Sequence, residues 1–347
     1  MNDSAEATSA YVARRLDELD SKPRAAIVQG LGFDEGSVGA EVGAPNAGKT
    51  ALAISLSVHI AARAERWLGL KILGGPVLYF GAEAPGSVIM RAKAAARRMG
   101  VSNLPLYISQ AVPGLGGEGS TFTDAERIIA TARAIAALEG EMVRLICIDT
   151  LAACLAGADE NNDGMLRLVA AAQRIALATS AFVLLIHHPS KGDAAGLRGH
   201  GSLAAACDSI IRIDVDELTK VRTATLIKAR DAATGLQLRY ELEQVILEER
   251  DSFGDSLSTI VVRPTEQQPA KPRPSGRRQN ELLTELERRY RTDQRQWDEA
   301  TAREAGRGLG MTKSSAQSAL KGLVEAGHLQ GTTSCLTLRY PPSEGTK

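Results

Sequence analysis

Short apolar runs alternate with longer helical stretches along most of the chain. Seven runs predict strands, and the first five are continuously apolar, as expected for parallel strands buried on both faces. Alternation of strands and helices is typical of the α/β class with a doubly wound, mainly parallel sheet. The predicted strands are Val38–Val42, Val77–Phe80, Leu106–Ile108, Val143–Ile148, Phe182–Ile186, Ile210–Ile213 and Thr223–Ile227, and the helices include Lys49–Trp67, Ala125–Leu138 and Met165–Thr179.

The pattern changes toward the C-terminus. The segments Leu236–Leu242, Val245–Leu247 and Thr259–Val262 predict antiparallel strands at one edge of the sheet. The following stretch is rich in Pro and charge and predicts a linker. Three helices and a strand pair then predict a small winged-helix domain; they are Asn280–Arg291, Trp297–Ala305, Thr312–Ala326, Gln330–Ser334 and Cys335–Tyr340. The expected division is an N-terminal helical segment (1–24), an α/β core (25–263), a linker (264–278) and the winged helix (279–347).

Composition agrees with this division and narrows the setting. Apolar residues make up 44% and aromatic residues only 4%, which suits helices on a parallel sheet. The four cysteines form no CxxC pair, so we expect buried thiols in a reducing cytoplasm. No apolar run reaches membrane-spanning length and the N-terminus is polar, so we expect neither a membrane span nor a signal peptide.

Charge is unevenly distributed although the formal net charge is zero. From Pro264 onward, 14 Lys and Arg stand against 10 Asp and Glu, which leaves 27 against 31 in the rest of the chain. A mildly basic tail permits local contact with nucleic acid but does not require it.

One motif has direct chemical meaning. The run Gly43, Ala44, Pro45, Asn46, Ala47, Gly48, Lys49 and Thr50 is a complete phosphate-binding loop between a predicted strand and a predicted helix. Its glycines let backbone N–H groups face phosphates, Lys49 supplies a positive charge, and the Thr50 hydroxyl is a Mg²⁺ ligand. The motif therefore predicts binding of ATP with Mg²⁺.

Other predicted strands end in residues that suit hydrolysis. Asp149 ends an apolar strand about 100 residues after the loop and is the expected second Mg²⁺ ligand. Glu83 follows another strand and is either the base that orients the attacking water or an acid near a helix start. His187 and His188 end a buried strand, where one of them is a candidate sensor of the γ-phosphate and a structural pair is the alternative.

Three sets of cations are candidate contacts for partners. Lys191, Arg198 and His200 occupy a glycine-rich stretch that is either a surface turn or a DNA-gripping loop. Lys228 and Arg230 point the same way along a strand and are either salt-bridge partners or fingers that reach a neighbouring subunit's ATP site. Lys313, Gln317 and Lys321 lie on the polar side of the third tail helix, which suits a major groove, although such domains also bind protein.

Taken in order, the segments GAPNAGKT, YFGAEAPGSVIMRAKA, LICIDTLAACLAGADENNDGM, FVLLIHHPSKGDAAGLRGHGSLAAACDSIIRI and KARDAATG resemble the RepA-type hexameric plasmid helicases and related phage RecA-like ATPases. The resemblance covers roughly 25–250. It implies a RecA-like P-loop core in which Glu83 is the catalytic base, His187 or His188 the sensor, and Arg230 with Lys228 acts in trans. It also implies that the 155–164 and 192–201 loops face DNA in a central channel. The added winged helix departs from this family.

The resulting prediction is a cytoplasmic, ring-forming ATPase that moves on single-stranded DNA, a replicative helicase of a plasmid or phage. A homo-oligomer, in the form of a hexameric ring, is expected, with duplex DNA or a replication protein as a further partner of the winged helix. Two alternatives stay open. One is a recombination or annealing ATPase that coats single-stranded DNA, and the other is an ATP-gated replication regulator or loader that acts through the winged helix.

Overall fold

The structure is a computed structural model that describes residues 15–18, 24–117, 121–158, 163–188, 201–216, 219–267, 274, 276–292, 296–325, 328–332 and 334–338. It separates into two compact units, residues 1–269 and 270–347. The division falls inside the stretch predicted as a linker.

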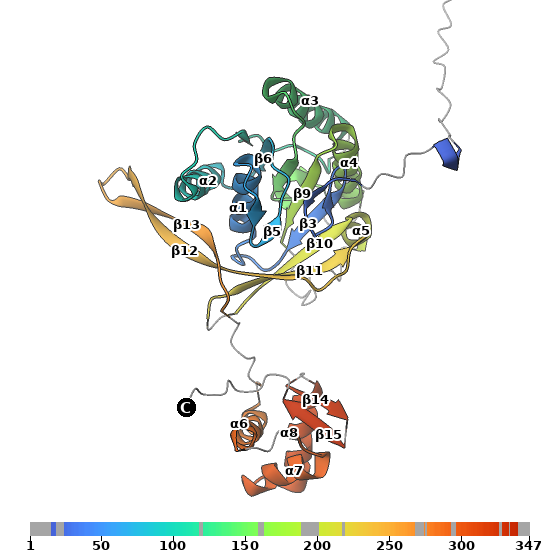
Figure 1. The fold of residues 1–347 in the computed structure, drawn as a ribbon, viewed down its shortest axis with the longest axis vertical. Helices are drawn as coiled ribbons and strands as arrows, with labels where there is room; N and C mark the ends of the chain where they lie inside the picture. The colour runs from blue at the N-terminus through green and yellow to red at the C-terminus, as the bar shows by residue number, and fades with distance from the viewer. Residues whose placement is uncertain are drawn as a thin grey trace, which may run out of the picture. The chain divides into compact units, whose positions relative to one another are not determined.

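A nine-stranded sheet organises the first unit, in the order β13-β12-β11-β10-β3-β9-β8-β6-β7 (Figure 1). The strands from β10 to β7 are parallel, whereas β11, β12 and β13 are added antiparallel at one edge. The doubly wound, mainly parallel sheet predicted from the sequence is therefore confirmed. The strands are β3 (Val38–Val42), β6 (Val77–Gly81), β7 (Leu106–Ser109), β8 (Leu145–Asp149), β9 (Phe182–His187), β10 (Ser209–Val215), β11 (Arg222–Ala229), β12 (Gln237–Arg250) and β13 (Ser256–Pro264).

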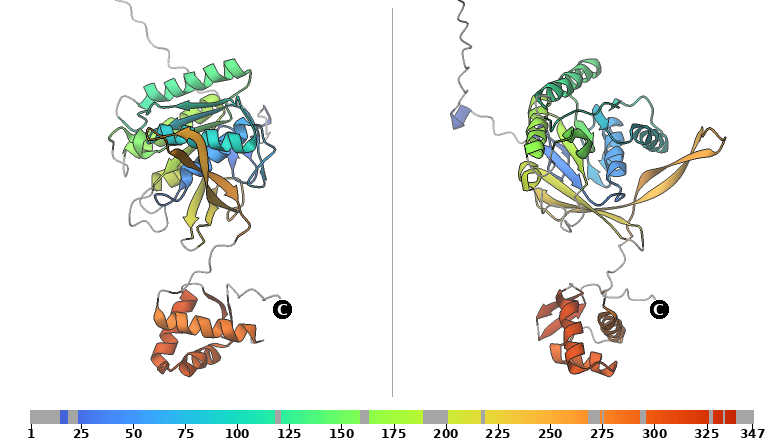
Figure 2. Two further views of the ribbon diagram at one scale, coloured as in Figure 1. Left: turned by 90° about the vertical axis from the view of Figure 1, so that its left-hand side faces the viewer. Right: turned by 180° about the vertical axis from the view of Figure 1, so that it is seen from behind.

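Helices cover both faces of this sheet (Figures 1 and 2). The helices α1 (Lys49–Ala61) and α2 (Pro85–Met99) pack on one face, where Leu52, Leu56 and Val88 join a cluster with Tyr79 and Cys147. The helices α3 (Thr121–Glu139), α4 (Asp163–Thr179) and α5 (Gly201–Ala206) pack on the other face. Burial on both faces explains why the central strands are continuously apolar.

The antiparallel edge forms a long two-stranded ribbon. The sequence pattern breaks near Glu243 and predicted two strands there, but β12 runs unbroken for 14 residues. The ribbon passes α2, where Arg98 pairs with Glu243 and Arg97 with Glu249. Charged side chains on one face of the strand therefore have partners on a helix, which the alternation alone did not indicate.

The predicted helix Lys49–Trp67 is too long. α1 ends at Ala61, and Arg63 adopts a left-handed conformation that turns the chain. Trp67 then enters the short strand β4 and donates a hydrogen bond to the Ser55 hydroxyl, so its burial comes from folding back on α1. The remaining short elements are η1 (Leu16–Glu18), β1 (Ala26–Val28), β2 (Phe33–Asp34), β4 (Arg66–Trp67), β5 (Leu70–Lys71) and η2 (Ala152–Leu155).

The second unit contains three helices and a two-stranded antiparallel hairpin around its own core. Asp298 caps one helix by accepting the backbone N–H of Thr301, which starts that helix two residues later than predicted. The first helix begins at Arg277, inside the predicted linker. The elements are α6 (Arg277–Arg291), α7 (Glu299–Gly308), α8 (Lys313–Glu325), β14 (Leu329–Thr332) and β15 (Cys335–Leu338).

Candidate functional site

Four neighbouring parallel strands bring the predicted ATP-site residues to one edge of the sheet. β3 runs into the phosphate-binding loop, β8 ends at Asp149, β6 leads to Glu83, and β9 ends at His187. In the register, Asp149 lies beside Gly81, and His187 lies beside Val42. Because the carboxyl ends of parallel strands meet at the same edge, residues separated by more than 100 positions converge there.

The phosphate-binding loop has the tight backbone that its glycines predict. Gly48 and Asn46 have positive φ angles of 96° and 63°. A Cβ on Gly43 would lie 2.7 Å from the carbonyl oxygen of Ile213, and one on Gly48 would lie 3.0 Å from Nε of Arg222. Larger residues therefore do not fit at either glycine. The loop leads directly into α1, whose first N–H groups have no helical acceptors and can bind an anion.

Lys49 is held inside this loop. Its side chain is 3% exposed, and Nζ donates to the carbonyl oxygens of Gly43 at 2.7 Å and Ala44 at 2.8 Å. Burial lowers the pKa of Lys49 to about 8, while the carboxylates of Glu41, Asp149 and Glu83 oppose that shift. These carbonyl bonds can be exchanged for phosphate oxygens, so the lysine is placed to bind a polyphosphate.

Asp149 and Thr50 form a pair of oxygen donors beside the loop. The Thr50 hydroxyl donates to Oδ1 of Asp149 at 3.2 Å, and the Tyr79 hydroxyl donates to Oδ2 at 2.6 Å. Burial raises the pKa of Asp149, and the hydrogen bonds from Tyr79 and Thr50 act against that rise. A hydroxyl and a carboxylate at this spacing fit Mg²⁺, whose other ligands would be phosphate oxygens and water.

Glu83 faces this group of residues. Its carboxylate accepts a short hydrogen bond from the hydroxyl of Thr150, which directly follows Asp149. The helix that comes next begins at Pro85 with Ala84 as its N-cap. The carboxylate thus contacts the end of β8, which suits a base that positions water.

The two histidines at the end of β9 have different surroundings. His187 is completely buried. His188 is partly exposed; burial and the charge of Lys49 lower its pKa, whereas Glu83 raises it. His188 is therefore electrostatically coupled to the ATP site and is the better placed sensor, a distinction that the sequence left open.

Three further residues of this region were missed by the sequence analysis. Tyr79 orients Asp149, and Arg91 on α2 lies close enough to lower the pKa of that aspartate. Glu41 on β3 is fully buried, and burial together with the charge of Asp149 raises its pKa well above the usual range. Glu41 did carry a signal, because it is a charged residue within an otherwise apolar strand.

Lys228 and Arg230 do not join this site. They lie at the end of β11, which is antiparallel to β10, so the chain carries them toward the amino ends of β3 and β10. Arg230 donates to Asp208 at 2.7 Å, and Lys228 donates to backbone carbonyls at the C-terminal end of α5 and just after it. Neither residue can reach its own phosphate-binding loop from this position.

The candidate DNA contacts lie in two parts of the chain. Lys191, Arg198 and His200 fall outside the described residues, as does part of the 155–164 loop. On α8, Lys313, Gln317 and Lys321 are exposed, while the opposite face of the helix is buried through Ala316, Leu320 and Leu323. The polar face that the sequence predicted is thus open to solvent.

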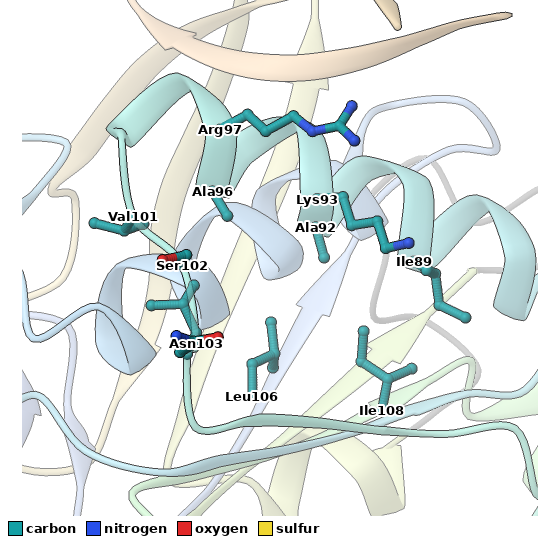
Figure 3. A pocket seen from close by; sticks show the side chains of 11 residues that line it. Ile89, Ala92, Lys93, Ala96, Arg97, Val101, Ser102, Asn103, Leu106 and Ile108 are labelled. Carbon is teal, nitrogen blue, oxygen red and sulfur yellow. The ribbon is translucent and has the colours of Figure 1, made fainter. Parts of the chain in front are cut away.

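An apolar groove of about 430 Å³ lies away from these residues, between α2 and the edge strand β7 (Figure 3). It is lined by Ile89, Ala92, Lys93, Ala96, Arg97, Val101, Ser102, Asn103, Leu104, Leu106 and Ile108. Within the described ranges, no cluster of three or more His, Cys, Asp or Glu side chains is placed to hold a metal by itself. Among the same residues, no helix is long and apolar enough to cross a membrane.

Comparison with known proteins gives one family match and two structural likenesses. A family model described as an AAA domain, AAA_25, matches residues 3–194. The ATPase domain of a phage helicase is 14% identical with a TM-score of 0.44, covering 59% of this chain and 81% of that one. The RadB recombinase is 18% identical with a TM-score of 0.42, covering 61% of this chain and 89% of that one. No curated protein matches the sequence.

Proposed function

The chain belongs to the AAA_25 family of AAA domains, and from this membership we propose that it is a ring-forming ATPase that moves on single-stranded DNA. The coarser part, an ATPase that binds nucleotide at its P-loop, is supported by the family match and by the loop geometry. The finer part, a replicative helicase of the RepA type, rests on the quoted motifs.

Each residue of the site has a role in this proposal. The loop from Gly43 to Lys49 binds the phosphates, and Thr50 with Asp149 would hold Mg²⁺, which supplies charge neutralisation when bound. Glu83 orients and polarises the attacking water. Arg230 completes the site of a neighbouring subunit, because it lies too far from the loop of its own chain.

One observation carries the link to DNA. β9 ends at the ATP site, where His188 is coupled to Lys49 and Glu83. The chain then continues within three residues to Lys191, and afterwards to Arg198 and His200. A change at the γ-phosphate therefore has a short covalent path to the cations that we propose bind DNA. In a ring, each such cation is repeated in every subunit, which strengthens a weak contact.

The experiment that tests this function combines hydrolysis with strand displacement. ATP turnover is measured with and without single-stranded DNA, and unwinding is measured on a forked duplex. Arg198→Ala should lower single-strand affinity and DNA-stimulated turnover, and Arg133→Ala on the exposed side of α3 is the matched control. An unchanged affinity and salt dependence in Arg198→Ala would contradict the proposed DNA contact.

Two alternatives give different results in the same assays. A recombination or annealing ATPase would bind single strands and hydrolyse ATP without displacing a strand. A regulator or loader acting through the second unit, which we interpret as a winged helix, would lose all DNA-stimulated turnover when 264–347 is deleted. Particle images with an ATP analogue, with and without single-stranded DNA, would establish whether rings form.

A further inference from the structure

The C-terminal end of α5 and the turn that leads from it into β10 are bound by both cations of the Lys228–Arg230 segment. Lys228 Nζ donates to the carbonyl oxygens of Ala204 at 2.5 Å, Ala205 at 3.2 Å and Cys207 at 2.7 Å. Arg230 Nε contacts the carboxylate of the next residue, Asp208, at 2.7 Å. Two side chains at the end of one strand thus hold the whole segment 204–208.

The contacts of Lys228 are those of a helix cap. The last carbonyl groups of a helix accept no hydrogen bond within it, and a lysine near the C-terminus can bind them. All three donors of the ammonium group are used on these oxygens. This arrangement differs from the role that the family resemblance implied, in which Lys228 accompanies Arg230 into a neighbour's ATP site.

Arg230 has a different kind of attachment. Its side chain remains 59% exposed while it is paired with Asp208. The other oxygen of Asp208 accepts the backbone N–H of Val38, at the start of the strand that leads to the phosphate-binding loop. Asp208 therefore fixes where Arg230 lies relative to β3, while leaving much of the guanidinium open to another molecule.

We propose that Lys228 and Asp208 are positioning residues that couple α5 to Arg230. The segment 204–208 comes soon after the stretch with the proposed DNA contacts, so a displacement of α5 pulls on Lys228 and changes the hold of Asp208 on Arg230. In this mechanism Lys228 transmits DNA binding to the finger and does not touch phosphate. The inference rests on the proposed function, because it assumes that Arg230 acts in trans.

The test compares Lys228→Met, Asp208→Asn and Arg230→Ala, with Lys71→Met on β5 as the control lysine. Lys228→Met should keep basal turnover and lose at least about 5-fold of the stimulation by single-stranded DNA, the lower end of common coupling factors. Asp208→Asn keeps an oxygen for Val38 but loses the charge that holds Arg230. Its DNA-independent turnover should rise about 2- to 5-fold, the range that partly exposed ion pairs carry.

A chemical measurement reports the contact without relying on hydrolysis. Cys207 is fully buried and its carbonyl oxygen is one of the Lys228 acceptors. In a Cys335→Ser background, alkylation of Cys207 should be faster in Lys228→Met than in the parent or in Lys71→Met. Lys228→Arg, which can still donate to the carbonyls, should restore slow alkylation and much of the DNA stimulation. Thermal unfolding checks that each variant is folded.

Two results would overturn the coupling role. One is unchanged Cys207 alkylation in Lys228→Met. The other is loss of basal turnover that returns on mixing with Glu83→Gln, which would make Lys228 a finger that acts on the neighbour's phosphates. Failure of the proposed function itself looks different: Arg230→Ala would then hydrolyse ATP like the parent.

Discussion

The two ends of the parallel strands are built on different principles. At the carboxyl ends, side chains from β6, β8 and α1 bond to one another within one chain, as the contacts of Thr50, Tyr79 and Asp149 show. At the amino ends, Arg230 is level with the start of β3, about 13 Å back along the strand from the phosphate-binding loop at about 3.3 Å per residue. The first end is a nearly complete site, whereas the second supplies a cation that its own site cannot use. This contrast is the structural reason to expect a second subunit.

Replacing Arg230 tests the contrast most directly. Arg230→Ala should bind ATP normally but hydrolyse it about 10³-fold more slowly, because fingers of this kind stabilise charge only in the transition state. Turnover is measured together with equilibrium binding of a fluorescent nucleotide. Arg212→Ala, another partly exposed arginine at this edge of the sheet that pairs with Asp214, serves as the control.

Mixing experiments decide whether the arginine acts in trans. Rings that combine Arg230→Ala with Glu83→Gln contain some interfaces in which both halves are intact, so part of the activity should return. Absence of recovery over a range of ratios, in rings shown to exchange subunits, would mean that the two ends do not cooperate between subunits.

Removing the carboxylate of Glu83 tests the other end. Glu83→Gln keeps the shape and should retain nucleotide binding, while turnover falls about 10²- to 10⁴-fold, the usual contribution of a general base. Thr150→Val removes the hydroxyl that holds Glu83 and should lower turnover less. Parental turnover in Glu83→Gln would assign this carboxylate a purely structural role.

The same contrast explains how much the sequence could predict. The phosphate-binding loop is a local motif, and Asp149 and Glu83 follow apolar runs whose carboxyl ends must meet in a parallel sheet. Their convergence was therefore predictable from order alone. The contacts of Tyr79 and Arg91 with Asp149 depend on how β6 and α2 are turned toward that residue, and no sequence spacing specifies this.

Residues at the opposite end were harder to interpret for a related reason. The acceptors of Lys228 lie more than 20 positions earlier and are backbone carbonyls, which have no residue-type signature. The unbroken length of β12 was missed because Glu243 interrupts the apolar pattern, although Arg98 on α2 pairs with it. Pairing between elements, rather than local propensity, determines both features.

Lys49→Ala should have a smaller effect on binding than the losses of turnover above. Losing a charged phosphate contact worth roughly 3 kcal/mol corresponds to about a 10²-fold weaker nucleotide affinity. Lys71→Ala, which changes an exposed lysine on β5, should leave affinity unchanged. Since Lys49 also satisfies the carbonyl oxygens of Gly43 and Ala44, thermal unfolding without nucleotide must accompany the binding measurement.

The smallest expected effect concerns the second unit, which has its own core and a separate proposed contact. Lys313 and Lys321 are exposed on α8, and Lys321 pairs only loosely with Glu325 at 3.6 Å, an arrangement that costs little to break. If α8 binds the major groove of duplex DNA, changing both lysines to Ala should weaken duplex binding about tenfold and lower the salt slope by about 2. Single-strand affinity and DNA-stimulated turnover should stay at parental values, the reverse of the result expected for Arg198→Ala. Arg288→Ala, an exposed change on α6 of the same unit, is the control for general charge. Titrations of single- and double-stranded DNA at two salt concentrations separate these outcomes. Unchanged duplex affinity with intact folding would instead favour a protein partner for this unit, and would leave DNA contact to the first unit alone.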